Sequence, residues 1–181
     1  MSRSALLFVA MLLWPSIALA EAGAFQPPKP GPEHQKLAGL VGTWTSEGVC
    51  EANPFGPAEK WSSRIKNEWF PGKFAVVRHI EQKGSVTGDS VGLEIVAYDA
   101  SARAHTWYGI DSMGWSGFGK GSIKKDVLRT TFRYLVKEKP YQVRATVKGL
   151  GSDRLDFTLE YSEDGKAWKV ACTAIDTRVK G

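Results

Sequence analysis

Residues 141–161 read YQVRATVKGLGSDRLDFTLEY, and this stretch carries the pattern that decides the fold. Apolar and polar residues alternate on both sides of the turn sequence Gly151-Ser152-Asp153. A period of two is typical of β-strands with one buried face, and so short a turn joins two strands antiparallel. Such strands pack into a sandwich or a barrel. The apolar faces consist of Tyr141, Val143, Ala145 and Val147 before the turn, and Leu155, Phe157, Leu159 and Tyr161 after it.

The same alternation extends from Gly42 to the C-terminal end and predicts about ten strands. Turns rich in Gly, Pro and Asp separate them, and most are too short for a parallel crossover. We therefore expect an all-β protein, an antiparallel up-and-down barrel, because closure of such a meander removes exposed edge strands. The expected strands cover residues 42–50, 61–70, 73–82, 91–98, 105–112, 115–123, 127–136, 141–149, 154–162 and 167–178.

Two segments precede the predicted domain, residues 33–181. Residues 1–20 combine Arg3, an apolar run and Ala18-Leu19-Ala20, which are features of a secretory signal peptide rather than of a membrane anchor. Residues 21–32 are rich in Pro and Gly and predict an extended tether. One short helix is expected from Pro32 to Leu40. We predict a mature protein that begins near Glu21 and resides in the bacterial periplasm or is secreted.

The formal net charge is +5, with basic residues scattered among acidic ones. This balance weakly attracts anions but lacks the basic stripe of a nucleic-acid interface, so no nucleic-acid partner is expected. After residues 1–20, no apolar stretch is long enough to span a membrane.

The chain contains two cysteines, Cys50 in the first predicted strand and Cys172 in the last. In a closed barrel these strands are neighbours, and export would place the chain where thiols oxidise. We therefore predict a disulfide between them. The alternative is a pair of reduced, buried thiols that lie out of register.

Three segments resemble a bacterial family of exported, lipocalin-like barrel proteins classed as a domain of unknown function. Leu40-Val41-Gly42-Thr43-Trp44 is similar to the Gly-x-Trp opening of lipocalins, in which the Trp closes the barrel floor. The other two segments are VGLEIVAYD at 91–99 and IDSMG at 110–114. The resemblance implies a calycin-like barrel from Leu37 to the C-terminal end.

Nitrobindin, a ten-stranded relative that binds haem, has its haem-ligating His near the C-terminus. Here residues 172–181 contain no His, and His34, His79 and His105 show no metal-binding spacing. We therefore expect no haem, metal or other cofactor.

Motifs of enzymes are also missing. Gly114-Trp115-Ser116-Gly117 lacks the spacing of a nucleophile elbow. Residues 117–122, GFGKGS, fail the phosphate-loop templates. Glycines at 117, 119 and 121 instead keep one strand face free of side chains, either for close packing against a large aromatic residue or for a ligand. No catalytic residue is predicted.

Candidate binding residues are polar groups on otherwise apolar strand faces: Asn67, Arg78 and Asp176. A charge that faces a barrel interior needs a partner or a ligand. Arg78 could pair with Asp176 or anchor an anionic group of the ligand. Alternatively, these positions lie at the barrel rim. Trp44 and Trp115 complete the candidate site, because broad aromatic walls suit a small apolar ligand.

Two classes of function fit this sequence. The first is a barrel that binds a small apolar or amphipathic molecule in its interior. The second is an envelope enzyme that uses Arg78, Asp111 and Asp176 at the barrel mouth for acid–base chemistry. A structural or partner-binding role of the Pro-rich tether is a third possibility. The absence of nucleophile and metal motifs favours binding.

Overall fold

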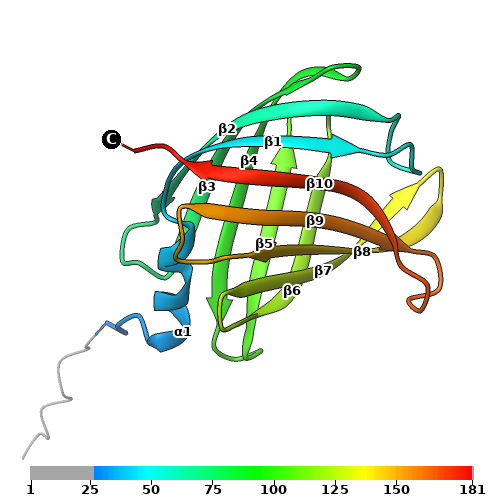
Figure 1. The fold of residues 1–181 in the computed structure, drawn as a ribbon. Helices are drawn as coiled ribbons and strands as arrows, with labels where there is room; N and C mark the ends of the chain where they lie inside the picture. The colour runs from blue at the N-terminus through cyan, green and yellow to red at the C-terminus, as the bar shows by residue number, and fades with distance from the viewer. Residues whose placement is uncertain (1–26, 181) are drawn as a thin grey trace, which may run out of the picture.

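The protein is a closed barrel of ten antiparallel strands with one short N-terminal helix (Figure 1). This computed structural model describes residues 27–180. The predicted signal peptide and residues 21–26 of the predicted tether lie outside the described residues. The elements are α1 (Pro32–Gln35), the 3₁₀ helix η1 (Lys36–Leu40), β1 (Gly42–Cys50), β2 (Glu59–Trp69), β3 (Ala75–Gly84), β4 (Gly88–Asp99), β5 (Ala104–Asp111), β6 (Ser116–Lys124), β7 (Val127–Val136), β8 (Lys139–Lys148), β9 (Arg154–Ser162) and β10 (Lys169–Arg178).

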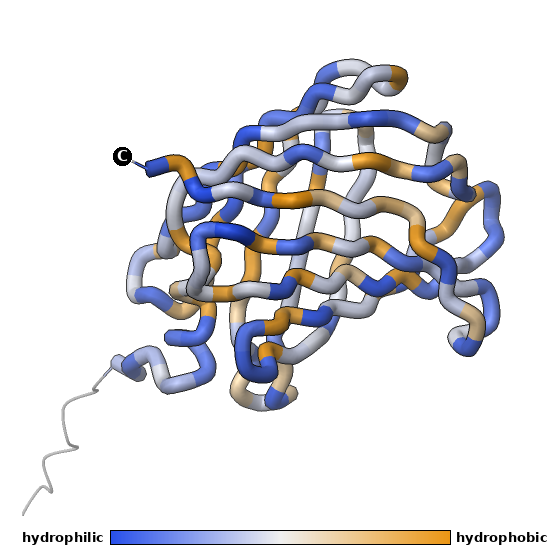
Figure 2. Tube along the Cα trace, viewed as in Figure 1, coloured by the Kyte–Doolittle hydropathy of each residue, from blue (hydrophilic) through white to orange (hydrophobic). Residues whose placement is uncertain are grey.

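Each strand pairs with its neighbours in sequence, and β1 pairs with β10 to close the barrel. Figure 1 shows β1 and β10 side by side. Hydrophilic and hydrophobic residues alternate along the strands in Figure 2, as the period of two predicted. The predicted fold class is therefore confirmed. Within residues 27–180, no helix combines the length and the apolar character needed to cross a membrane.

Strand bounds differ from the prediction at several hairpins. The predicted strands 127–136 and 141–149 leave residues 137–140 between them, but β8 begins at Lys139 and the turn is at Lys137 and Glu138, which both have positive φ. Pro140 belongs to β8, opposite Leu135. The strand predicted to start at 73 starts at Ala75, because Lys73 has a φ of 59° and cannot continue an extended chain.

The helical end of the barrel is closed by apolar side chains. Leu37 and Leu40 of η1 are fully buried against Trp44 of β1. The Leu40 carbonyl accepts hydrogen bonds from Trp44 Nε1 at 2.9 Å and from Asn67 Nδ2 at 2.8 Å. The Arg178 guanidinium lies 4.1 Å from the centre of the Trp44 ring. Trp44 therefore closes the barrel floor, as the lipocalin-like opening implied.

The predicted disulfide is present. Cys50 and Cys172 are directly opposite each other in the β1–β10 pair, with Cα atoms 4.0 Å apart. Because Cys50 ends β1, the bridge lies at the other end of this strand from the helix.

Candidate ligand-binding cavity

The barrel encloses a cavity of about 530 Å³ between its closed floor and its opposite end. Strands β7, β8 and β9 supply an aliphatic wall, because their inward positions carry apolar side chains. The residues of this wall include Leu128, Val143, Ala145, Val147 and Leu159.

The adjoining wall, on β5, β7 and the β5–β6 turn, is aromatic. Trp107 of β5 stacks on Phe132 of β7 with ring centroids 5.0 Å apart, and Trp115 lies 5.3 Å from Trp107. Tyr134 extends the wall at 6.0 Å from Trp115. These stacked and tilted rings together form a broad apolar surface.

Glycines make this wall possible. A Cβ added to Gly117 would lie 2.7 Å from Cζ2 of Trp115, and one added to Gly109 would lie 2.6 Å from Cζ2 of Trp107. Neither position could hold a larger residue without displacing an indole. Gly117 therefore serves close packing against a large aromatic residue, the first of the two roles that the spacing indicated, whereas Gly119 and Gly121 pack closely against Thr130 and the Arg129 backbone of β7.

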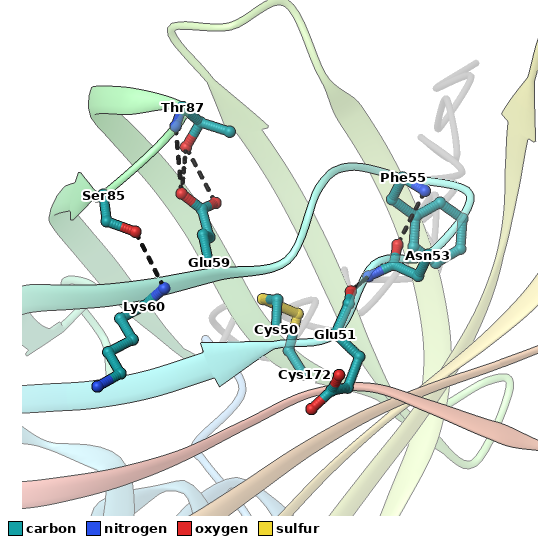
Figure 3. The surroundings of a disulfide bond; sticks show 9 residues. All are labelled: Cys50, Glu51, Asn53, Phe55, Glu59, Lys60, Ser85, Thr87 and Cys172. Carbon is teal, nitrogen blue, oxygen red and sulfur yellow. Dashed lines mark hydrogen bonds between the residues drawn. A yellow bond between two sulfur atoms is a disulfide. The ribbon is translucent and has the colours of Figure 1, made fainter.

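Phe55 lies at the mouth of the cavity, in the loop between β1 and β2. Its ring makes edge contacts with Tyr134, Tyr141 and Tyr161 at centroid distances of 5.2, 5.8 and 5.6 Å. The amide of Phe55 donates to Asn53 Oδ1 at 2.8 Å (Figure 3). Sequence reasoning missed Phe55, although an aromatic residue within the polar, Pro-rich segment 51–58 is a usable signal.

Asp111 shapes the β5–β6 turn at the same mouth. Its Oδ1 accepts hydrogen bonds from the amides of Met113 at 2.9 Å and Trp115 at 3.0 Å. This carboxylate, considered above for acid–base chemistry, therefore fixes the backbone that presents Trp115 to the cavity.

The inner end of the cavity carries an ion pair. Arg78 Nη1 lies 2.7 Å from Glu94 Oε2, and the two side chains are only 15% and 19% exposed. Arg78 Nε also donates to Asn67 Oδ1 at 3.3 Å. The hypothesis that Arg78 pairs with Asp176 is wrong, because Glu94 is its partner. Sequence alternation missed Glu94 because its strand carries apolar residues on both faces.

Asp176 lies in the interior as well. It accepts a hydrogen bond from Ser46 Oγ at 2.5 Å and is 6% exposed, while Asn67 is 3% exposed. These two residues are therefore not at the rim, the alternative considered above. Burial raises the pKa of the Asp176 carboxyl above its ordinary value, whereas the Ser46 hydrogen bond and the Arg78 charge lower it to a smaller extent.

The predicted site residues thus occupy three places in the barrel. Arg78 and Trp115 line the cavity. Trp44 and Asn67 bind the Leu40 carbonyl at the floor, and Asp176 lies beyond the ion pair. Side chains that sequence reasoning did not include are Phe55, Glu94, Trp107, Phe132 and Tyr134.

Two of the three histidines make hydrogen bonds near the N-terminal helix, whereas His79 is exposed on β3. His105 is buried, accepts a hydrogen bond from the Ile123 amide on Nδ1, and has Nε2 3.2 Å from the Glu33 carbonyl. Burial lowers the pKa of His105. His34 Nδ1 accepts from the Gly31 amide. Among residues 27–180, no three His, Cys, Asp or Glu side chains form a group that could hold a metal ion.

Residues 29–178 match the family described as "Protein of unknown function (DUF1579)". No curated protein matches the chain. The crystal structure of Rv2717c from M. tuberculosis is similar with a TM-score of 0.59 and 14% identity, covering 83% of this chain and 99% of that one. The S-type phycobiliprotein lyase CPES from Guillardia theta has a TM-score of 0.55 and 12% identity, covering 84% and 99%. At these identities the likenesses show the fold alone, and that fold is the lipocalin-like barrel.

Proposed function

We propose that this chain, which belongs to the DUF1579 family, binds a small apolar or amphipathic molecule inside its barrel. The observation that carries the proposal is the cavity of about 530 Å³ behind Phe55. Ligand cavities measure about 300–1,000 Å³ and combine apolar walls with a few polar groups. Arg78 and Glu94 are the charged pair within this cavity.

The cavity walls favour a flat molecule. The indoles of Trp107 and Trp115, backed by glycines, present ring faces and edges, while β8 and β9 present branched aliphatic groups. A planar ligand can stack on the aromatic wall and pack against the aliphatic wall at the same time. A barrel that served structure alone would be filled by its own side chains to the density of a protein core.

Native mass spectrometry of the protein purified from its own host tests the proposal. We expect a small molecule at one per chain that is released on denaturation. Ala145→Phe places a ring in the cavity and should abolish this mass, whereas Ala102→Phe, in an exposed turn, should retain it. Ligand-free protein, with tryptophan fluorescence unchanged across a panel of lipids and aromatic metabolites, would contradict binding.

We also propose that the protein is exported. The signal-like residues 1–20 support this, and the Cys50–Cys172 disulfide is typical of oxidising compartments. N-terminal sequencing of the protein from its native host should begin near Glu21. A sequence that begins at Met1 would contradict export.

A further inference from the structure

The barrel contains a second, smaller cavity of about 260 Å³ beside the first. The two cavities share Arg78, Glu94, Phe157 and Leu159, so the ion pair stands where they meet. The small cavity extends toward β1, β2 and β10, and the disulfide forms part of its wall.

Three polar residues of this cavity lie side by side on neighbouring strands. Ser46 of β1 is opposite Asp176 of β10 and opposite Ser63 of β2. The Ser46 hydroxyl donates to Asp176, so its proton is already used. Ser63 is only 8% exposed, yet its Oγ has no hydrogen-bond partner among the described residues. Buried polar side chains nearly always have one.

Glu94 differs from Ser63 because it already has a partner. Its Oε2 lies 2.7 Å from Arg78 Nη1, so the guanidinium is its counter-charge. A carboxylate oxygen is an acceptor, and a serine hydroxyl can accept as well as donate. A ligand group that meets both Asp176 and Ser63 can therefore do so with N–H donors.

The charges of the cavity identify the sign of that ligand group. Glu94 balances the single guanidinium of Arg78, while Asp176 accepts its hydrogen bond from a neutral serine. A buried carboxylate without a directly paired counter-charge is costly. Burial is the main cause of the raised pKa of Asp176, and the Arg78 charge offsets it only in part.

Glu59, a further carboxylate of this cavity, is already hydrogen-bonded to the β3–β4 turn. It accepts hydrogen bonds from the Val86 amide at 3.2 Å, the Thr87 amide at 3.2 Å and Thr87 Oγ1 at 3.0 Å (Figure 3). These bonds tie the β3–β4 turn to β2. Because Glu94 is paired with Arg78, Asp176 is the carboxyl of this cavity that remains for a ligand.

We propose that the small cavity binds a protonated amine of an amphipathic ligand, with its N–H groups directed at Asp176 and Ser63 Oγ, which lie on either side of Ser46. This inference rests on the proposed function, because the apolar body of the same ligand occupies the large cavity. One ammonium group supplies Asp176 with a counter-charge and gives Ser63 Oγ a donor. An anionic head would meet two carboxyls and an arginine already paired, so the expectation that Arg78 anchors an anionic group is replaced.

Three probes with one aromatic body and different heads test the inference: naphthylmethylamine, naphthylmethanol and naphthylacetate. Calorimetric and fluorescence titrations near neutral pH should show that the amine binds at least about tenfold more tightly than the carboxylate, with the alcohol between them. Asp176→Asn keeps the shape and an acceptor for Ser46 but removes the charge. It should weaken the amine to within about twofold of the alcohol and leave the alcohol unchanged.

Ser63→Ala is the second variant, because Ser63 Oγ has no partner to lose and the fold should tolerate its removal. It should weaken the amine about threefold without lowering the thermal unfolding temperature. Equal binding of all three probes would overturn the amine site and leave the proposed function intact. Binding by none of them, together with the absence of a co-purifying molecule, would overturn both.

Discussion

The ion pair of Arg78 and Glu94 is the residue-scale feature that most directly links strands inside the barrel. They lie opposite each other on β3 and β4, and Arg78 also reaches Asn67 on β2, so one cluster ties three strands together. Removing one partner of a mostly buried pair leaves a charge without compensation, whereas removing both does not.

A double-mutant cycle measures this dependence. Glu94→Gln and Arg78→Met should each lower the free energy of unfolding by about 1–3 kcal/mol, a range reduced because both side chains keep some solvent contact. The double variant should lose less than the sum of the two. Urea unfolding of the four proteins provides the values. Strict additivity would show that the pair contributes nothing beyond two separate side chains.

The raised pKa of Asp176 predicts how the stability of the protein depends on pH. This pKa is raised in the folded state by burial, from an ordinary value of 3.8. The folded state therefore holds the proton more tightly, and the contribution of Asp176 to stability is greatest below about pH 4 and is lost as the pH rises through the folded-state pKa.

Comparison with Asp176→Asn isolates this contribution. The free energy of unfolding of the wild type minus that of the variant should fall as the pH rises from about 4 to about 7. Chemical unfolding at several pH values gives the difference, and Asp89→Asn, an exposed position, controls for general charge effects. A difference that rises with pH would show that the carboxylate, not the acid, is the form that the fold stabilises.

At the scale of elements, β5 and β6 act as the support of the aromatic wall. Their facing glycines, Gly109 and Gly117, are cross-strand partners, so Trp107 and Trp115 share one cleared area of the sheet. The turn held by Asp111 then fixes Trp115 at the mouth.

Gly117→Ala tests this support. The added methyl group would lie 2.7 Å from the Trp115 ring and must displace it, so we expect about 1–3 kcal/mol of destabilisation and a shift in tryptophan emission. Gly92→Ala is the matched strand control, since its nearest new contact is at an ordinary 3.5 Å. Thermal unfolding and fluorescence spectra compare the two. Equal effects would mean that strand glycines matter here only through backbone entropy.

At the scale of the whole molecule, closure depends on the β1–β10 pair. These two strands come from opposite ends of the domain, so their pairing has the largest loop-closure entropy cost of any strand pair in the barrel. The disulfide joins residues 122 positions apart at this seam.

Replacing both cysteines with serine should therefore lower the free energy of unfolding by about 2–4 kcal/mol, less than the roughly 5 kcal/mol of the chain-entropy estimate, because residual structure in the unfolded chain reduces the effect. Guanidinium unfolding of wild type and variant measures the loss, and thiol counting under denaturing conditions verifies the bridge. Two free thiols per chain in exported wild-type protein would contradict it.

The sequence by itself determined the barrel. Period-two alternation, short turns and the residues around Trp44 are local signals, and the neighbours that they specify are close in the chain. It also paired Cys50 with Cys172, because closure of a meander dictates which strands meet. Tertiary structure alone decided the partner of Arg78, the position of Phe55 over the mouth and the division of the interior into two cavities. These features depend on how side chains from strands distant in sequence fill a shared volume, and alternation, which reports only the face of each strand, carries no information about that volume.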